Sequence, residues 1–471
     1  MMRIAAGVAV VFSTAVFVQR AAVDPSSSET ALDRYVAAPD SNYSWKVAQT
    51  LPAEGANVTV IEMTSQKWLT EKEVVRPLWT HRVTVVTPQS VTRDTGLLVI
   101  TGGRLDRDPP AAPPSWLAET ARDTASVVAE LRLVPNEPVV FKDDPEHKQR
   151  VEDDFIAYTW IHYLRTGDDR WPARLPMTKS AVRAMDTVTA FEASSDGGRH
   201  RVSRFVVTGA SKRGWTTWAT AAVDKRVIAI APCVIDLLNV EPSFIHHWRA
   251  YGLWSNALKD YVEQGVVDWL GSAEFHRLMQ IEEPYEYRDR LTMPKMLVNA
   301  SGDQFFLPDS SQFYFDDLRG EKHLRYVPNT NHGLEKSDAS ETVQAFYAAV
   351  VGGRPRPEFS WTFEKDGSIR VVAKERPESV TFWQATNPEA RDFRFDVIGP
   401  AYTPTPLAAE GPNTWIAHPH APPRGWTASF VELTFPTGGR RPLKMTTAVR
   451  VLPDTLLYPP PPQPHAAKGG R

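Results

Sequence analysis

The sequence predicts an α/β fold, in which a mostly parallel sheet carries helices on both faces and a small all-β sandwich follows. Three observations predict it. Short apolar runs such as 96–101 and 204–208 are typical of strands buried on both faces. Segments with helical spacing separate these runs, which indicates βαβ units with right-handed crossovers. From residue 357 onward, short alternating runs favour a separate antiparallel unit.

The first domain is expected to span residues 24–353. Its N-terminal part contains two β-branched runs, 57–63 and 78–87, which predict antiparallel strands. The later expected elements are, in order, a strand at 96–101, a helix at 116–133, a strand at 138–141, helices at 152–164 and 179–191, a strand at 204–208, a helix at 215–223, strands at 227–232, 296–300 and 324–328, and a helix at 337–350. An aromatic-rich insert at about 235–290 is expected to form a helical cap over the domain.

The C-terminal region is expected to form a small β-sandwich over residues 354–457. A length of 471 residues exceeds what one hydrophobic core usually serves, which agrees with a second domain. The expected strands are 359–363, 368–373, 379–384 and 427–435. Residues 458–471 include four consecutive prolines, which cannot pack as helix or strand, so we predict an extended and mobile tail.

The N-terminus has the form of a secretory signal. Arg3 precedes an apolar run over 4–18, and polar residues follow from Gln19. We therefore predict a signal peptide over 1–23 and export to the periplasm or the extracellular space. An uncleaved anchor is the alternative, but the apolar run falls short of the ~20 residues that a spanning helix needs. No later segment is apolar enough to span a bilayer, so we expect no transmembrane domain after signal removal.

Composition excludes several classes of partner. With 53 Lys+Arg against 56 Asp+Glu and no basic block, the chain lacks the electrostatic footprint of a nucleic-acid-binding protein. We expect a small-molecule, glycan-ester or peptide substrate and no nucleic acid, and the oligomeric state stays open. Cys233 is the only cysteine in the sequence, so no intramolecular disulfide can form.

The turn from Gly209 to Gly214 carries the candidate nucleophile, Ser211. It follows a buried strand and precedes a helix, which is the setting of the nucleophile elbow in an α/β-hydrolase. The usual G-x-S-x-G is stretched to G-x-S-x-x-G, because Arg213 stands where a small residue belongs. A phosphate-binding turn and a purely structural turn are the alternatives, and the glycine spacing of a P-loop is absent.

Candidates for the acid and the base follow two later strands. Acyl transfer by serine needs a histidine that removes the proton and an acid that orients this histidine. Asp303 is preferred as the acid because it lies nearer the strand end than Asp309, for which a helix N-cap is the simpler explanation. His332 is the candidate base. The chain order Ser211, Asp303, His332 across successive strand ends matches the order in this fold.

Stabilisation of the oxyanion requires hydrogen-bond donors beside the nucleophile. The fold uses the N–H of the residue after the serine, here Lys212, and an N–H from the loop after an earlier strand, here Gly102-Gly103. An ordinary strand-ending turn is the alternative for the two glycines. We expect Trp215 and, within the cap, Trp248 to line the substrate site, although most cap aromatics are expected to fill the core of the cap.

Metal catalysis is disfavoured by the spacing of the histidines. His246 and His247 are adjacent, so on a helix their side chains diverge and cannot grip one ion as an i, i+4 pair does. The sequence has no H-E-x-x-H motif and no cysteine cluster. We therefore expect neither a metal nor another cofactor.

The chain resembles the PhoPQ-activated pathogenicity-related proteins, a group of α/β-hydrolases, from about Leu32 to Val351. The resemblance rests on the segments 32–36, 39–40, 43–45, 134–136, 209–215, 301–306 and 327–332. It implies export and a Ser-Asp-His centre at Ser211, Asp303 and His332. The elbow is also similar to that of glucuronoyl esterases, in which a basic residue after the serine helps to stabilise the oxyanion. Lys212 matches that residue, but Ala210 stands in place of that family's cysteine.

Three functions are compatible with these residues. The first is an exported serine hydrolase that cleaves an ester or an amide, including esters of the glucuronoyl type. The second is a secreted binding or signalling protein that keeps the fold without turnover. The third is a peptidase. Lys212 beside the nucleophile further predicts a substrate with negative charge near the reacting carbonyl.

Overall fold

The computed structural model describes residues 29–108, 113–420 and 422–465. The predicted signal peptide over 1–23 lies outside these described residues. Within the described part of the chain, no helix has both the length and the apolar character that crossing a membrane requires.

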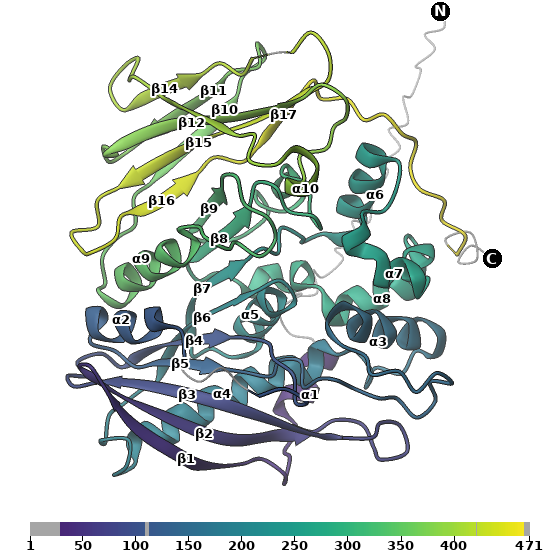
Figure 1. The fold of residues 1–471 in the computed structure, drawn as a ribbon, viewed down its shortest axis with the longest axis vertical. Helices are drawn as coiled ribbons and strands as arrows, with labels where there is room; N and C mark the ends of the chain where they lie inside the picture. The colour runs from purple at the N-terminus through teal and green to yellow at the C-terminus, as the bar shows by residue number, and fades with distance from the viewer. Residues whose placement is uncertain (1–28, 109–112, 421, 466–471) are drawn as a thin grey trace, which may run out of the picture.

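One large sheet runs through the molecule, and its centre is parallel (Figure 1). Its strands lie in the order β1-β2-β3-β5-β4-β6-β7-β8-β9 before the C-terminal strands continue it. Their bounds are β1 Ser44–Ala53, β2 Ala56–Lys67, β3 Leu78–Pro88, β4 Thr95–Ile100, β5 Val128–Leu131, β6 Arg204–Ala210, β7 Val227–Cys233, β8 Lys295–Ala300 and β9 Lys322–Val327. The neighbouring strands β5, β4, β6, β7, β8 and β9 pair in parallel, whereas β1, β2 and β3 pair antiparallel. The predicted α/β-hydrolase fold is confirmed.

Successive residues of the central strands point to opposite faces of the sheet, and both faces are covered. In β4, Leu97 belongs to one core cluster and Leu98 to the other, and in β6 the same holds for Val206 and Val207. The helices that pack on the two faces are α1 Ala31–Ala37, α3 Glu152–Thr166, α4 Arg174–Ala193 and α5 Lys212–Val223 on one side and α2 Ser115–Thr124 and α9 Ala339–Val351 on the other. Full burial explains why these strands read as continuous apolar runs.

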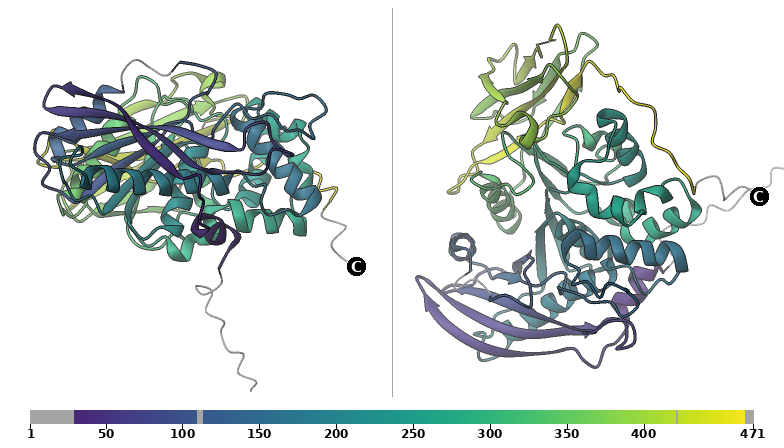
Figure 2. Two further views of the ribbon diagram at one scale, coloured as in Figure 1. Left: turned by 90° about the horizontal axis from the view of Figure 1, so that it is seen from below. Right: turned by 45° about the vertical axis from the view of Figure 1, so that its right-hand side comes forward.

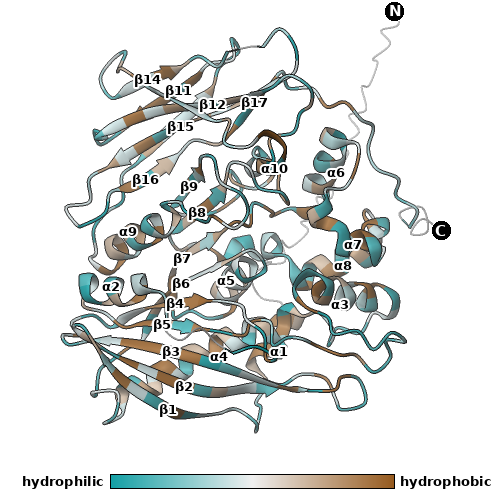
Figure 3. Cartoon of the chain, in the orientation of Figure 1, coloured by the Kyte–Doolittle hydropathy of each residue, from teal (hydrophilic) through white to brown (hydrophobic). Residues whose placement is uncertain are grey.

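The antiparallel strands at the N-terminal edge are more exposed than the central strands, although residues 83–88 of β3 are buried. Along β2 and β3 apolar and polar residues alternate, as the colours of Figure 3 show. The edge strand β1, which we did not predict, is exposed over nearly all of its length. Its residues lack the alternation of apolar and polar side chains that predicts a half-buried strand. The strand is held in place by its pairing with β2.

The C-terminal strands form two layers at the opposite end of the molecule from β1 (Figure 2). One layer is a separate sheet of β10 Phe359–Phe363, β11 Ile369–Ala373 and β14 Thr414–Ala417. The other layer contains β12 Ser379–Asn387, β13 Thr403–Pro406, β15 Trp426–Phe435, β16 Leu443–Thr446 and β17 Arg450–Leu452. Because Thr446 of β16 pairs with Leu324 of β9, this second layer continues the main sheet.

The insert between β7 and β8 is helical and packs beside α3 (Figure 1). It contains α6 Val240–Tyr251, α7 Lys259–Glu263 and α8 Ala273–Glu282, with short 3₁₀ turns between and after them. Residues 458–465, the described part of the proline-rich tail, have neither helix nor strand and lie along this insert. The N–H of Tyr458 donates to the carbonyl of Arg249 at 3.1 Å, and the ring of His465 stacks on Trp269 at 4.2 Å.

Two predicted elements were wrong. The helix expected over 116–133 ends at Thr124, and the missed strand β5 follows, with all four of its residues buried. A buried run this short cannot be told from a helical segment by periodicity. Residues 138–141 form only isolated bridges, Val139 with Arg150 and Phe141 with Val74, because no neighbouring strand lies alongside them.

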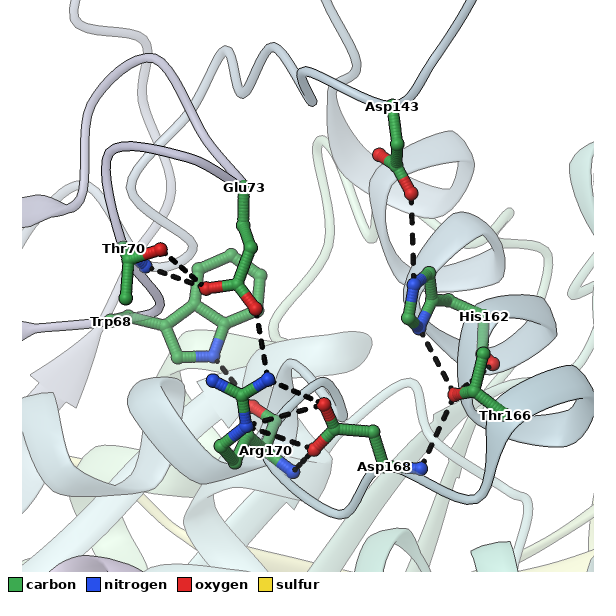
Figure 4. Close-up of polar contacts among 8 residues, drawn as sticks. All are labelled: Trp68, Thr70, Glu73, Asp143, His162, Thr166, Asp168 and Arg170. Atoms are coloured by element: carbon green, nitrogen blue, oxygen red, sulfur yellow. Dashed lines mark hydrogen bonds and ion pairs between the residues drawn. The ribbon is translucent and has the colours of Figure 1, made fainter.

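A polar cluster fixes the connection between α3 and α4 against the loop after β2 (Figure 4). The guanidinium of Arg170 pairs with Glu73 at 2.9 Å and with Asp168 at 2.5 Å. The indole N–H of Trp68 donates to the carbonyl of Arg170 at 3.0 Å. The cluster thereby anchors the C-terminal end of α3, the helix whose N-terminus reaches the candidate active site.

Candidate active site

Ser211 occupies a sharp turn between β6 and α5. Its backbone has φ 57° and ψ −127°, a conformation that costs a non-glycine residue of order 1–3 kcal/mol and persists only where neighbours impose it. Its N–H donates to the carbonyl of Cys233 at 2.9 Å, and its own carbonyl accepts the N–H groups of Gly214 and Trp215. These bonds hold the half-buried serine at the tip of the turn.

The glycine spacing of the turn follows from two close approaches. A Cβ at Gly209 would lie 2.7 Å from the carbonyl oxygen of Arg213, and a Cβ at Gly214 would lie 2.7 Å from the side chain of Ile235. The second glycine is therefore needed one position later than in G-x-S-x-G. Arg213 is tolerated because its side chain leaves the turn and crosses Gly102, where a Cβ would collide with its guanidinium.

Arg213 also connects two segments on which the family resemblance rests. Its Nε donates to the carbonyl of Val134 at 2.6 Å, and its Nη2 donates to Glu152 at 2.6 Å. Arg213, the residue that departs from the usual elbow, thus connects the start of α5 to the loop after β5 and to the start of α3.

Asp303 and His332 are hydrogen-bonded. Nδ1 of His332 lies 2.8 Å from Oδ2 and 3.0 Å from Oδ1 of Asp303, and this carboxylate also accepts the N–H of Phe305 at 2.8 Å. The backbone N–H of His332 donates to Gln304 at 3.0 Å. Asp303 is buried, and the other ring nitrogen of His332, Nε2, is buried with no hydrogen-bond partner among the described residues. The imidazole is therefore oriented through Nδ1 and unoccupied at Nε2.

The three predicted residues lie at the same edge of the sheet. Ser211 follows β6, Asp303 follows β8 and His332 follows β9, and these strands run parallel. Phe305 links them, because it lines the cavity at Ser211 while its ring lies 4.4 Å from the ring of His332. No hydrogen bond joins Ser211 Oγ to His332 Nε2 in the described part of the chain.

Asp309, the less favoured candidate for the acid, belongs to another buried cluster. Its carboxylate pairs with Arg391 at 2.6 Å and with Nε2 of His246 at 3.1 Å, and all three side chains are buried. Burial by itself would raise the pKa of Asp309, but the charges of Arg391 and His246 outweigh it and hold the pKa below its ordinary value. Asp309 does occupy the expected N-cap position, before the 3₁₀ turn Ser310–Phe313, but its side chain caps no backbone N–H and pairs with Arg391 and His246 instead.

Lys212 follows Ser211, and two carboxylates balance the charge of its ammonium. Its ammonium lies 2.7 Å from Glu152 and 3.3 Å from Asp153, and its side chain is 8% exposed. Burial opposes ionisation of Glu152, but Lys212 and Arg213 outweigh it and lower its pKa to about 2. As the first residue of α5, Lys212 has a backbone N–H without an intrahelical acceptor, as an oxyanion donor requires.

A second carboxyl group, that of Glu137, lies next to Glu152. Glu137 is buried and accepts the backbone N–H of Glu152 at 2.7 Å. Burial and the nearby charge of Glu152 raise the pKa of Glu137 to about 8. This pair could not be predicted from the sequence, since acidic residues at a helix start are ordinarily explained by the helix dipole.

The cavity at Ser211 is small, with a volume of about 40 Å³. Its wall is mainly aromatic and aliphatic. The lining residues beyond Ser211 and Lys212 are Asp153, Ile156, Trp160, Arg174, Trp215, Ile235, Leu237, Phe244, Leu258, Tyr261, Phe305 and Phe306. Trp215 is among the lining residues, whereas Trp248 is not and packs on Trp254 at 5.2 Å. Trp160, Phe305 and Phe306 were not singled out from the sequence.

A much larger cleft of about 1310 Å³ opens beside this cavity. Gly103 and Glu152 line it, together with polar residues of β1, β2 and β3 such as Thr64 and Thr80. Gly102, the other predicted oxyanion glycine, is covered by the side chain of Arg213, and its carbonyl accepts the N–H of Leu133 at 3.2 Å.

The described residues contain no group of three or more His, Cys, Asp or Glu side chains placed to hold a metal ion. His246 and His247 diverge, as expected. His246 pairs with Asp309, and Nε2 of His247 accepts the N–H of Ser255 at 3.1 Å.

Comparison with protein families identifies the chain. The model of the PhoPQ-activated pathogenicity-related proteins matches residues 32–394. The chain belongs to this family. This family member is 37% identical over 458 residues to the autocrine proliferation repressor protein A of Dictyostelium discoideum, with 91% of this chain and 92% of the relative covered.

Solved structures similar to this family member include esterases and peptidases. An acetyl xylan esterase from Paenibacillus sp. R4 has a TM-score of 0.48 and 16% identity, over 68% of this chain and 92% of the other. A glucuronoyl esterase from Solibacter usitatus has a TM-score of 0.37 and 13% identity, over 61% and 76%. A puromycin-hydrolysing peptidase from Mycobacterium tuberculosis has a TM-score of 0.37 and 15% identity, over 68% and 41%.

Proposed function

We propose that this family member is an exported serine hydrolase that cleaves an ester or an amide bond. The observation that carries the proposal is the 2.8 Å contact between His332 Nδ1 and Asp303. It leaves Nε2 buried, without a hydrogen-bond partner among the described residues, at the sheet edge where Ser211 also lies. A histidine oriented through one nitrogen by a carboxylate is the arrangement that a general base requires.

In the proposed reaction, Ser211 Oγ attacks the substrate carbonyl and its proton passes to His332 Nε2. Asp303 accepts the hydrogen bond from Nδ1–H and stabilises the imidazolium that forms. The backbone N–H of Lys212 donates to the oxyanion. His332 then protonates the leaving alcohol or amine, and a water molecule, activated by the same imidazole, releases the acyl group from Ser211.

Export is part of the proposal and rests on the N-terminal sequence. Arg3 followed by the apolar run 4–18 has the form of a secretory signal. Expression of the full chain in a bacterial host should yield periplasmic or extracellular protein that lacks the first ~20 residues. Recovery of protein with an intact N-terminus in the membrane fraction would favour an uncleaved anchor instead.

Labelling with a fluorophosphonate probe tests the central claim. The wild type should be labelled and Ser211→Ala should not, because the probe captures an activated serine. Ser195→Ala, which removes an exposed serine of the loop after α4, is the matched control and should label like the wild type. Absence of Ser211-dependent labelling in folded protein would exclude the hydrolase.

A secreted binding or signalling protein is the second candidate. Two observations favour it, namely the missing hydrogen bond between Ser211 and His332 and the 37% identity to a relative named as a proliferation repressor. Such a protein would fold normally, fail to label and leave short-chain esters, glucuronate esters and aminopeptidase substrates unhydrolysed. The same three substrate types would distinguish an esterase from a peptidase if labelling succeeds.

A further inference from the structure

We infer that the site hydrolyses esters of short acyl chains, of about two to four carbons, carried by a large polar alcohol. This inference rests on the proposed function, since it assumes that Ser211 is the nucleophile. The cavity that contains Ser211 has a volume of about 40 Å³. One water-sized group needs about 10–15 Å³ of such volume, so the cavity has room for roughly three heavy atoms.

The wall of the cavity is fixed by packing, so it cannot easily widen. The ring of Trp160 stacks beside Trp215 at 6.0 Å and meets Tyr261 edge-on at 5.5 Å. The indole N–H of Trp215 donates to the carbonyl of Leu237 at 2.7 Å, and the hydroxyl of Tyr261 donates to Asp153 at 3.1 Å. Longer acyl chains would have to displace these rings, which densely packed interiors resist.

The cavity also offers no free charge to an acyl group. Lys212 pairs with Asp153 and Glu152. The buried guanidinium of Arg174 pairs with Glu282 at 3.3 Å and donates to the carbonyl of Lys212 at 2.6 Å. A neutral apolar acyl group is therefore the chemical class that fits, because a charged one would be buried without a partner.

The large cleft beside the cavity offers space for the alcohol part of the substrate. Glu152 lines the 1310 Å³ cleft while its ion-pair partner Lys212 lines the small cavity, so this ion pair forms the partition between the two spaces. Ser211 and Lys212 line the cavity, whereas Gly103 lines the cleft. An ester with its acyl group in the cavity can extend its alcohol into a cleft whose polar lining and volume suit a polyhydroxylated molecule.

A series of p-nitrophenyl esters tests the acyl half of the inference. The kcat/KM of the wild type should fall at least about 100-fold from acetate to octanoate, because each methylene beyond the cavity costs burial or displaces the wall. Phe244→Ala, which removes a cavity wall, should raise the octanoate-to-acetate ratio at least about tenfold. Phe275→Ala truncates an equally buried phenylalanine of the cap outside the cavity and should leave the ratio unchanged.

Several outcomes overturn the inference. Octanoate hydrolysed as well as acetate by the wild type would do so, as would an equal shift of the ratio in both variants. If Phe244→Ala does not fold, Leu258→Ala, at another wall residue, takes its place with the same expectation. Fluorophosphonate labelling keeps the two claims apart. Loss of Ser211-dependent labelling removes the proposed function, whereas retained labelling with a preference for long chains removes only the inference.

The alcohol half is tested with a peracetylated glucoside against ethyl acetate. The glucoside should have a kcat/KM at least about tenfold higher, because its ring gains contacts in the cleft that ethyl acetate lacks. Equal values for the two acetates would remove the alcohol half of the inference.

Discussion

The imidazole Nδ1 of His332 lies 2.8 Å from the carboxylate of Asp303, although the same loop offers a second carboxylate six residues later. That second carboxylate, Asp309, pairs with a different histidine, His246, and with the buried Arg391. Among the described residues, Asp303 and Asp309 thus each pair with a histidine, His332 in a half-buried setting and His246 in a buried one. Only the pair at His332 lacks an arginine and leaves the other imidazole nitrogen without a partner among the described residues.

Asp303→Asn should lower kcat by about 10³-fold or more, because the amide no longer stabilises the imidazolium of His332. His332→Ala should cause a similar loss. The measurement is kcat for p-nitrophenyl acetate, with circular dichroism to verify folding. Asp309→Asn serves as the control: the folded protein should keep kcat within about tenfold of the wild type. A loss of activity in Asp309→Asn alone would reverse the assignment of the acid.

Arg391→Ala should destabilise the fold strongly, because it leaves the carboxylate of Asp309 buried without its nearest cation. Removing one partner of a buried ion pair typically costs about 3 to 5 kcal/mol. The measurement is the free energy of unfolding in urea. Arg424→Ala, which removes an exposed partner of Glu389, should cost less than about 1 kcal/mol. Equal losses in both variants would contradict the structural role of Arg391.

Glu152→Gln should lower kcat for neutral esters, with a smaller effect on KM. The carboxylate of Glu152 holds both residues that follow Ser211, Lys212 at 2.7 Å and Arg213 at 2.6 Å, so its loss lets the proposed oxyanion donor, the N–H of Lys212, move. Glu71→Gln, which removes an exposed carboxylate at Lys67, is the control and should match the wild type. A selective rise in KM would indicate that Glu152 contacts substrate instead of positioning the elbow.

Lys212→Ala should reduce activity equally on acidic and neutral esters. The sequence alone predicts a greater loss on acidic substrates, but the ammonium of Lys212 is neutralised by Glu152 and Asp153. Paired charges attract a substrate anion weakly, so the main effect should be on the position of the turn. The measurement compares kcat/KM for a methyl glucuronate ester and p-nitrophenyl acetate. A selective loss on the glucuronate ester would restore the expectation of an acidic substrate.

Asp236→Asn should make stability less sensitive to rising pH. Burial raises the pKa of Asp236 to about 7 from an ordinary 3.8, against hydrogen bonds from Tyr314 and Tyr326. The folded state therefore keeps a proton that the unfolded state loses. The stabilisation that this bound proton adds to the free energy of unfolding is complete below about pH 4 and is lost as the pH rises to about 7. Between pH 4 and pH 8, the unfolding free energy of the wild type should fall relative to that of the variant. Parallel curves would contradict the raised pKa.

Much of the central sheet could be predicted because the residue types of its strands indicate that the strands are buried. Strands β4, β6, β7 and β8 are buried on both faces and appear as unbroken apolar runs. The exposed edge strand β1 and the four-residue β5 could not be predicted, because their existence depends on the neighbours with which they pair.

For the candidate site, the sequence by itself determined the residue types and their order: a serine in a glycine turn, then an aspartate and a histidine after later strands. Chain order and strand ends place such residues at one edge of a parallel sheet, so Ser211, Asp303 and His332 could be named in advance. Only the tertiary structure decided which aspartate meets His332, why Arg213 is tolerated in the elbow, and that Lys212 is neutralised by Glu152. Those relationships join residues far apart in the chain, and their distances are set by the packing of helices and loops, which leaves no periodic signal in the sequence.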